Sequence, residues 1–266
     1  MIYDPILLFG GYSILTILIL TSVYIFILGS TLTSFVHLVA DRIPQKESIN
    51  GRSHCPQCRN KLRWVDIIPF FGYFINKGKC HHCGSKIPII HPIMEFIGGV
   101  LFVLSFHIFG LTLELAASWI IILVLLCESV SDINEQIVID RVWMIGIIPL
   151  IVIRIIQHTI LDYLISASIM FILLYLIAYI GSKVSKKEAL GGGDIKLYLF
   201  IGFVITIEKS FLSLFLASII ALIYSMIKGK GKESYIPLVP FIAMGVLISY
   251  FLGDNIISLY LSLLGV

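Results

Sequence analysis

The stretch ILLFGGYSILTILILTSVYIFILGSTLTSFVHLV, residues 6–39, contains no Asp, Glu, Lys or Arg. About 20 consecutive apolar residues suffice for a helix to cross the hydrocarbon core of a bilayer. This run is longer, so we expect a retained transmembrane helix whose C-terminal end extends beyond the membrane. The first 41 residues carry no Lys or Arg, so the basic start of a cleavable signal peptide is missing.

The remainder of the chain is similarly apolar. Apolar residues make up 58% of the sequence and charged residues 13%, and the mean hydropathy is +1.01. Soluble domains are usually about 45–50% apolar even when Gly is counted. We therefore predict an all-α polytopic membrane protein with about eight transmembrane helices. After the first helix, the predicted spans are Ile93–Phe109, Leu113–Val130, Val142–Ile156, Ile160–Ile180, Ile195–Ile207, Phe211–Ile227 and Ile236–Leu252. A further run, Ile256–Leu264, is too short to cross by itself.

Residues 40–92 differ in composition from the rest and predict a small cytoplasmic domain between the first two spans. They hold nine of the nineteen Lys and Arg residues and four of the five cysteines. The predicted organisation is thus a first transmembrane helix (1–39), a cytoplasmic four-cysteine domain (40–92) and a transmembrane core (93–266).

The positive charges also predict the orientation in the membrane. With the N-terminus outside, eight crossings place the segments 40–92, 131–141, 181–196 and 228–235 in the cytoplasm, and these hold 17 of the 19 basic residues. Only Arg154 and Lys209 fall elsewhere. Basic residues concentrate in cytoplasmic loops, so the count supports this arrangement. Each basic cluster adjoins an apolar run, which favours a lipid bilayer over nucleic acid as the partner.

The cysteines are arranged as two pairs. Cys55-Pro-Gln-Cys58 and Cys80-His-His-Cys83 are separated by 21 residues, a spacing typical of a tetrahedral structural zinc site. Metal binding would help to fold a domain of this size, whose own core is small. Two disulfides are the alternative, but thiols stay reduced in the cytoplasm. His54, His81 and His82 are close enough in sequence to replace a cysteine ligand. We expect Cys127 to be a buried core residue.

Two carboxylates lie at predicted membrane edges on the cytoplasmic side. Asp132 ends the third span, and Asp194 begins the sixth, directly after Gly191-Gly192-Gly193. Ionisable residues at membrane depth are candidates for function because burying them is costly. Two carboxylates that share a site keep one proton between them, as in an aspartic protease. The helix start favours Asp194 as the ionised member.

The acidic residues of these membrane edges are also compatible with structural roles. The turn at Asp194 fits a simple loop and helix cap as well. Asp140 adjoins Arg141 and is compatible with an interfacial ion pair. Glu128 lies four residues before Asp132, on the same helix face, where it would tune the pKa of Asp132 or face a polar cavity. No GK[ST] follows the glycines, which argues against a phosphate-binding loop.

Taken together, these motifs resemble the type IV prepilin peptidases, the GxGD aspartic protease family, over nearly the whole chain. GGGDIKL, residues 191–197, is similar to GxGDxKL, and Asp132 to Asp140 resembles the segment D-x7-D, with Ile139 where Pro is usual. The end of the first helix resembles the family at Ser34, Phe35, Arg42, Ile43 and Pro44. The cysteine domain resembles it at Ser53–Cys58, Leu62, Trp64, Asp66, Pro69, Tyr73, Gly78, Cys80, Cys83, Pro92 and Glu95.

The resemblance implies a function and a set of site residues. Asp132 and Asp194 would be the catalytic pair, supported by Gly191, Gly193, Lys196 and Asp140. The enzyme would cut the cytoplasmic leader from prepilins or pseudopilins at the inner face of the bacterial cytoplasmic membrane. Members often also methylate the new N-terminus with S-adenosylmethionine. A leader peptidase without methyltransferase activity and a zinc-dependent membrane adaptor or carrier are the alternatives. No oligomeric state follows from the sequence.

Overall fold

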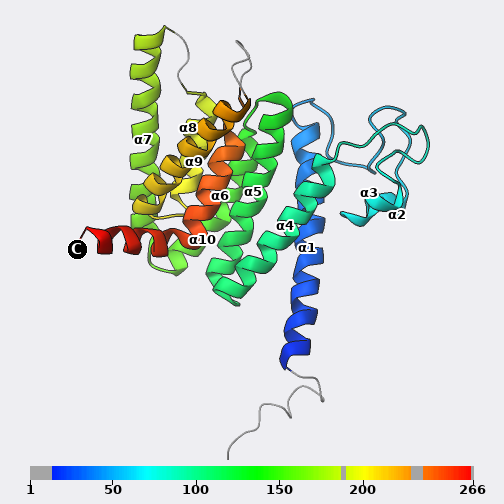
Figure 1. The fold of residues 1–266 in the computed structure, drawn as a ribbon, viewed down its shortest axis with the longest axis horizontal. Coiled ribbons are helices and arrows are strands. Elements are labelled where there is room, and N and C mark those ends of the chain that lie inside the picture. Colours follow the sequence, from blue (N-terminus) through cyan, green and yellow to red (C-terminus); the bar gives the residue numbers. More distant parts are fainter. Residues whose placement is uncertain (1–13, 187–189, 229–235, 265–266) are drawn as a thin grey trace, which may run out of the picture. The chain divides into compact units, whose positions relative to one another are not determined.

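The computed structural model describes residues 14–186, 190–228 and 236–264. The described residues form ten helices (Figure 1). They are α1 (Ile14–Arg42), α2 (Trp64–Ile67), α3 (Phe71–Ile75), α4 (Ile90–Phe109), α5 (Leu113–Glu135), α6 (Asp140–Ile156), α7 (Ile160–Ser185), α8 (Gly192–Gly202), α9 (Ile207–Lys228) and α10 (Val239–Leu263). The start of the first predicted span and the basic residues Lys187, Lys230 and Lys232 lie outside this part of the chain.

In the described part of the chain, six helices are long and apolar enough to cross a membrane: α1, α4, α5, α7, α9 and α10. This confirms the all-α polytopic class. The fourth and sixth predicted spans correspond to shorter helices, α6 with 17 residues and α8 with 11. At about 1.5 Å per residue, α8 is about 16 Å long and cannot cross a hydrocarbon core of about 30 Å by itself. The total of eight crossings stays a prediction.

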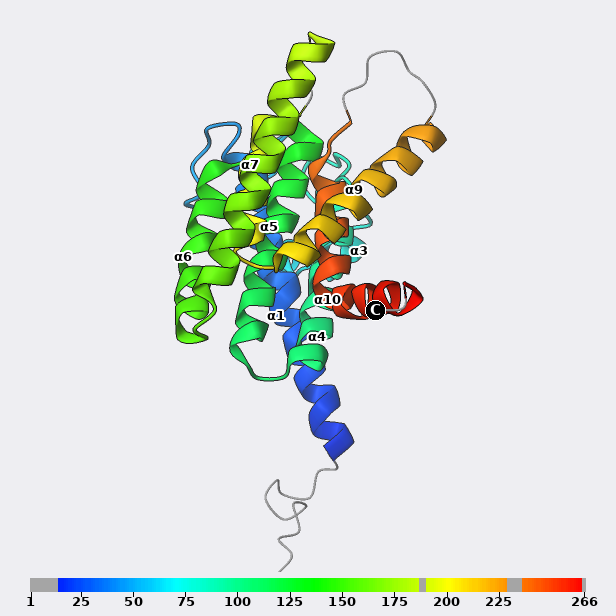
Figure 2. The same ribbon diagram turned by 90° about the vertical axis from the view of Figure 1, so that its left-hand side faces the viewer.

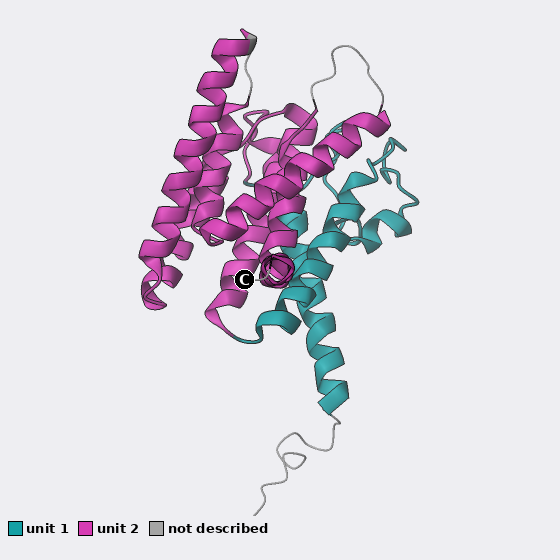
Figure 3. Ribbon diagram, turned by 60° about the vertical axis from the view of Figure 1, so that its left-hand side comes forward, with its two compact units in different colours: residues 1–35, 50–111 teal, residues 36–49, 112–266 magenta. Residues whose placement is uncertain are grey.

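The chain forms two compact units (Figure 3). Unit 1 comprises residues 1–35 and 50–111, and unit 2 comprises residues 36–49 and 112–266, apart from the residues that are not described. The last turns of α1 belong to unit 2, where Cys127 on α5 donates a hydrogen bond to the carbonyl of Val36 at 3.4 Å. Cys127 is fully buried, as expected of a core residue. The three-part division of the sequence stays a prediction.

Unit 1 contains the antiparallel pair α1 and α4 and the cysteine-containing segment. Small residues allow the two helices to approach closely. A Cβ atom added at Gly98 of α4 would overlap Thr33 of α1, and one at Gly99 would lie 2.5 Å from the hydroxyl of Ser30. Close contact through small residues is a common way to join helices in a membrane, where apolar side chains gain little by leaving lipid.

Unit 2 is a helical bundle built around α5. In the apolar stretch of α5 that could cross the membrane, 67% of the residues are buried inside the protein, more than in any other candidate span. α5 packs against α6 and α10, α7 against α8 and α9, and α9 against α10. Figure 2 shows α9 leaning away from α7 toward its C-terminal end. The last turn of α5 and the first turns of α6, α8 and α10 lie at the same end of unit 2 (top in Figure 1).

α10 combines two of the predicted apolar runs, Ile236–Leu252 and Ile256–Leu264, in one helix. The helix bends, so that its C-terminal part (red in Figure 1) runs across the direction of its first part. Near the bend, Lys209 of α9 forms an ion pair with Asp254 of α10 at 2.8 Å.

Candidate active site

Asp132 lies on the last turns of α5, and the residue is 8% exposed. Its Oδ2 atom accepts a hydrogen bond from the backbone amide of Val239 at 2.9 Å, and the amide of Leu238 also donates to the carboxylate. These amides open α10, whose first N–H groups have no partners within the helix. Asp132 therefore caps α10 from a different helix, and the positive end of the α10 dipole stabilises its charge.

Asp194 lies in the first turn of α8. Its carboxylate accepts a hydrogen bond from the backbone amide of Gly191. The glycines before it have different surroundings. A Cβ at Gly191 would lie 3.0 Å from Asp194 Oδ2, and one at Gly193 would lie 2.7 Å from Cγ2 of Val138, whereas one at Gly192 would meet nothing within 4 Å. Gly191 thus leaves room for the carboxylate, and Gly193 lets this turn approach the loop before α6.

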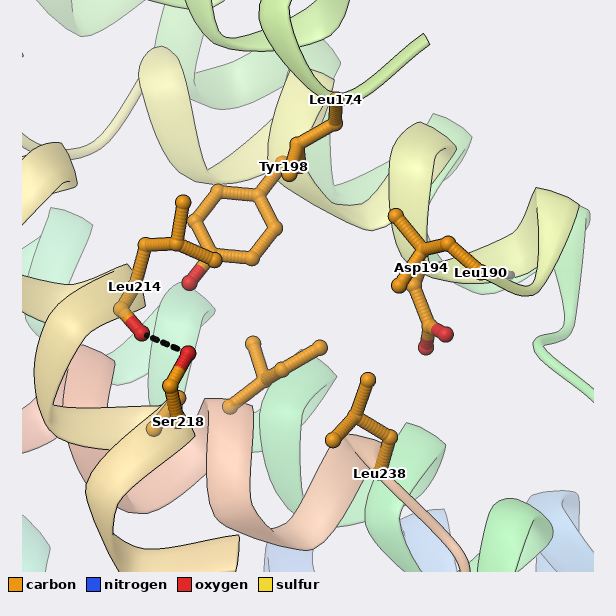
Figure 4. Close-up of a pocket in the computed structure, with 9 residues that line it drawn as sticks. Leu174, Leu190, Asp194, Tyr198, Leu214, Ser218 and Leu238 are labelled. Atoms are coloured by element: carbon orange, nitrogen blue, oxygen red, sulfur yellow. Dashed lines mark hydrogen bonds between the residues drawn. The ribbon is translucent and has the colours of Figure 1, made fainter. Parts of the chain in front are cut away.

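The fold brings the two carboxylates together. Asp132 is close enough to interact electrostatically with Asp194. Leu238 lies beside both residues, because its amide donates to Asp132 while its side chain lines a cavity with Asp194. Figure 4 shows the carboxylate of Asp194 pointing toward Leu238. The start of α10 is therefore the element that the two acidic residues share.

The cavity beside Asp194 has mainly apolar walls. It is lined by Leu174, Leu190, Asp194, Tyr198, Leu214, Ala217, Ser218, Leu238 and Ile242 (Figure 4). Ser218 donates its hydroxyl to the carbonyl of Leu214 at 2.8 Å, and the hydroxyl of Tyr198 lies 3.4 Å from that of Ser213. The hydroxyl of Ser218 is thus engaged within α9, and that of Tyr198 links α8 to α9. Asp194 supplies the carboxylate at this cavity.

Asp140, at the start of α6, forms an ion pair with Lys196 of α8 at 2.8 Å, and Trp143 donates to its other oxygen at 3.2 Å. The structure thus pairs Asp140 with Lys196, where the sequence suggested Arg141. The hydrogen bond from Lys196 holds the pKa of Asp140 below its usual range. Both side chains are about half exposed, so the pair links α6 and α8 at the surface.

Glu128 is fully buried, and it makes a contact that the sequence did not indicate. Its Oε2 atom accepts a hydrogen bond from the amide of Ile139 at 2.7 Å. Ser131, on the same helix, donates to the carbonyl of Ile137 at 2.6 Å. The two side chains fix the loop between α5 and α6, which contains Val138, the residue that packs against Gly193. Glu128 thus supports the glycine turn through this loop.

The four cysteines of unit 1 form a cluster. The sulfur atoms of Cys55, Cys58, Cys80 and Cys83 all lie within 4.8 Å of one another, and those of Cys55 and Cys83 are 3.8 Å apart. Four thiolates at about 2.3 Å from zinc in a tetrahedron stand about 3.8 Å apart, so the cluster fits a zinc ion. A disulfide requires about 2.05 Å, so the distance from Cys55 to Cys83 excludes one.

The two cysteine turns have the same construction. The amide of Arg59 donates to the carbonyl of Cys55, and the amide of Gly84 donates to the carbonyl of Cys80, both at 2.9 Å. Arg59 and Gly84 both have positive φ angles, which the chain needs to reverse within so few residues. Each turn thereby presents two thiols to one point. Next to the first turn, the Nη1 atom of Arg59 lies 3.2 Å from Nε2 of His54, which is outside the cysteine cluster.

The sequence did not indicate the backbone amides of Leu238 and Val239 as part of the site. The only available signal was Pro240, because proline favours the first turn of a helix. This residue locates a helix start, but it does not show that the start lies against Asp132.

Fold and site together define a polytopic helical membrane protein with two neighbouring carboxylates at helix ends and a separate four-cysteine cluster. Residues 27–109 match the bacterial peptidase A24 N-terminal domain, and residues 119–226 match the type IV leader peptidase family. The four cysteines fall in the first match, and Asp132 and Asp194 fall in the second. The chain belongs to the type IV leader peptidase family.

Similarity to individual relatives extends over most of the chain. A prepilin leader peptidase/N-methyltransferase of Bacillus subtilis (strain 168) is 33% identical over 246 residues, which are 90% of this chain and 97% of the relative. A protein of the same description from Vibrio cholerae is 31% identical, covering 88% of this chain and 96% of the relative. A type 4 prepilin-like proteins leader peptide-processing enzyme of Escherichia coli is 30% identical over 76% of each chain. No solved structure was found to match the chain.

Proposed function

We propose that this protein is a membrane aspartic endopeptidase that removes the cytoplasmic leader from type IV prepilins or pseudopilins, with Asp132 and Asp194 as its catalytic pair. One observation carries the proposal: the ends of α5 and α8 place these carboxylates within electrostatic reach of each other, beside the start of α10. Family membership and the names of the relatives support the substrate class.

Two carboxylates at close range do not both ionise easily, so one of them retains a proton. The ionised member then removes a proton from water as the water attacks the scissile carbonyl, while the protonated member donates a hydrogen bond to the carbonyl oxygen. Asp132 accepts from two backbone amides and Asp194 from one. Hydrogen bonds to an ionised carboxylate stabilise it, so we favour Asp132 as the ionised member, in place of Asp194.

The active site would lie at the cytoplasmic face of the bacterial inner membrane, with the N-terminus outside. The catalytic residues lie at the end of unit 2 where α6 and α8 begin and where α7 and α9 end. Arg141, Lys183, Lys196 and Lys228 lie near these helix ends in the sequence. A concentration of basic residues at one end supports a cytoplasmic position for that end.

The proposal is tested by expressing the full chain together with a prepilin-like substrate. Asp132→Asn and Asp194→Asn keep the shape of each side chain but remove its ability to ionise, so we expect each to abolish leader removal. Asp254→Asn is the matched control, since Asp254 pairs with Lys209 and we expect normal cleavage. Normal processing by either catalytic-pair variant would refute the aspartic mechanism. A wild-type chain that leaves the leader in place would favour the adaptor or carrier alternative.

We also propose that Cys55, Cys58, Cys80 and Cys83 hold a structural zinc ion. The spacing of the sulfur atoms supports this role. The zinc would join two turns that have little other core between them, and its four thiolate ligands would leave no open position for a reacting water. The metal would therefore stabilise the fold and take no part in cleavage.

Methylation of the new N-terminus with S-adenosylmethionine is the second activity that we propose. It rests on the names of the relatives, and no described residue is assigned to the methyl donor. A leader peptidase without this activity is the alternative. Mass spectrometry of the N-terminal peptide of the cleaved substrate distinguishes them, because a methylated peptide is heavier by one CH2 group. An unmodified N-terminus would show that the protein is a leader peptidase without methyltransferase activity.

A further inference from the structure

Arg154 is a charged side chain buried at the opposite end of α6 from Asp140. It is 1% exposed, and it is one of the two basic residues that the positive charge pattern did not place in the cytoplasm. Its guanidinium group donates hydrogen bonds to the carbonyls of Phe203 and Val204, at 3.3 and 2.8 Å. These carbonyls directly follow α8, so Arg154 caps the C-terminal end of that helix.

A group of polar side chains compensates the buried charge. Arg154 forms an ion pair with Glu114 of α5 and donates to the side chain of Gln157 at 2.7 Å. Its guanidinium group also stacks over the ring of Tyr163, 3.8 Å from the centroid. The hydroxyl of Tyr250 on α10 donates to Glu114 at 3.2 Å. Arg154 therefore contacts α5 and α7 directly, and α10 through Glu114, while it also holds the end of α8.

α8 needs such a fixed point because of its length. With 11 residues it does not reach across the bilayer, so its position along its own axis is set by contacts with the protein. Sideways, Gly202 fixes α8 against α7, since a Cβ there would overlap the backbone of Ala167. Along the axis, Arg154 holds the carbonyls at one end, and Asp194 is at the other end.

We propose that Arg154, with Glu114 as its counter-ion, is a positioning residue that sets the height of α8 and thereby holds Asp194 level with Asp132. This inference rests on the catalytic pair proposed above. A planar guanidinium group suits the role because its diverging N–H groups bind two carbonyls and a carboxylate at once. An ammonium group at the same place would keep the charge but lose this fork.

The experiment separates positioning from stability. In the double variant R154M/E114Q both charges are removed, so neither is left buried without a partner. With purified full-length protein in detergent, assayed below its melting temperature, we expect a kcat for leader cleavage at least about tenfold lower (about 1.4 kcal/mol in the activation barrier) and little change in KM. The melting temperature should fall as well, because the carbonyls of Phe203 and Val204 lose their donor. A double variant with the wild-type kcat would overturn the proposal.

Two further variants complete the test. R154K keeps the charge, so it decides the question if the double variant does not fold. We expect a lower kcat and a displaced pH–rate profile, because a shift of α8 changes the distance between the two carboxylates. A folded R154K enzyme with the wild-type kcat and profile would also overturn the proposal. The control, K209M, removes the ion pair between α9 and α10 and should retain the wild-type kcat.

The test of the catalytic pair with D132N and D194N is independent of the test of Arg154. If D132N and D194N are inactive while the Arg154 variants are normal, only the positioning role fails. If D132N or D194N cleaves normally, the proposed catalytic pair fails, and the positioning role fails with it.

Discussion

At the scale of single residues, the glycine turn before α8 shows how space next to a carboxylate is provided. Gly191 and Gly193 face Asp194 and Val138, while Gly192 faces open space. Only two of the three positions therefore need to lack a side chain. This gives a physical reason for the pattern GxGD, in which the second position varies.

The three glycines give a matched series of substitutions. Gly193→Ala forces a methyl group against Val138, and we expect a loss of about 1–3 kcal/mol in stability together with reduced cleavage. Gly192→Ala should change stability by less than about 1 kcal/mol, because the new methyl group meets nothing and Ala suits a helix. Thermal unfolding and a cleavage assay on the purified variants measure both effects. Equal effects at the two positions would contradict this account.

At the scale of elements, exposed ion pairs and buried packing contacts between helices contribute differently to stability. The pair of Asp140 and Lys196 joins α6 to α8, but both side chains are about half exposed. Exposed ion pairs contribute about 0–1 kcal/mol. The contacts of Gly193 and Gly202 join α8 to its neighbours inside the bundle, and there a single added methyl group has no room.

The link between α6 and α8 gives a prediction about pH. Lys196 lowers the pKa of Asp140 in the folded protein. The stabilisation of the fold by this ion pair is therefore present above the usual pKa of Asp, and it is lost as the pH falls through the lowered pKa of Asp140. Lys196→Met should lower the stability by at most about 1 kcal/mol at neutral pH and by nothing once Asp140 is protonated. Melting temperatures across the acidic range test this, and a larger loss that persists in acid would contradict it.

A double substitution identifies what Lys196 does. If its role is the ion pair alone, Asp140→Asn, Lys196→Met and the double variant should reduce cleavage by the same modest factor. A far larger loss for Lys196→Met would show that Lys196 acts on the substrate directly.

The cysteine segment is an element whose stability is expected to depend on metal. We predict about one zinc per chain, lost in Cys58→Ser or Cys80→Ser, because three thiolates and one hydroxyl bind zinc more weakly. Limited proteolysis should then cut within residues 50–89. Cys127→Ser is the matched control, since Cys127 lies in α5 and is not a member of the four-cysteine cluster, and it should leave the metal content unchanged. The zinc content is measured by elemental analysis of freshly purified, reduced protein. Finding no zinc would contradict the proposed site.

At the scale of the whole molecule, the proposed function requires that Asp132 and Asp194 face the cytoplasm, where the leader lies before cleavage. α6 begins at the end of unit 2 where Asp132 and Asp194 lie, so the loop between α6 and α7 lies at the opposite end (Figure 1). The basic residues near Asp132 and Asp194 in the sequence predict that this end of the bundle faces the cytoplasm.

This topology is tested by labelling single cysteines in intact cells. His158→Cys, in the loop between α6 and α7, should react with a thiol reagent that does not cross the membrane. Lys183→Cys, near the end of α7, should react only after the membrane is opened. Both side chains are exposed in the structure, so access within the protein is matched. The reverse labelling pattern would invert the orientation and remove the leader peptidase proposal.

Much of the fold could be predicted because apolar runs and helices coincide in this chain. The run Leu113–Val130, for example, is contained in α5, and Ile160–Ile180 in α7. The predicted span Ile195–Ile207 is an exception, since α8 ends at Gly202. Hydropathy does not distinguish a side chain surrounded by lipid from one surrounded by protein. The end of α8 contacts Arg154 and Ala167, which are distant from it in sequence.

The amino-acid sequence alone determined the membrane class, the two cysteine turns and the two acidic positions, because these follow from composition and from local spacing. Only the tertiary structure decided that Asp132 receives the first amides of α10, that Lys196 pairs with Asp140 and that Arg154 caps α8. Each of these contacts joins residues far apart in the chain. Such contacts depend on how the helices pack in three dimensions, and hydropathy and local motifs carry no information about that packing.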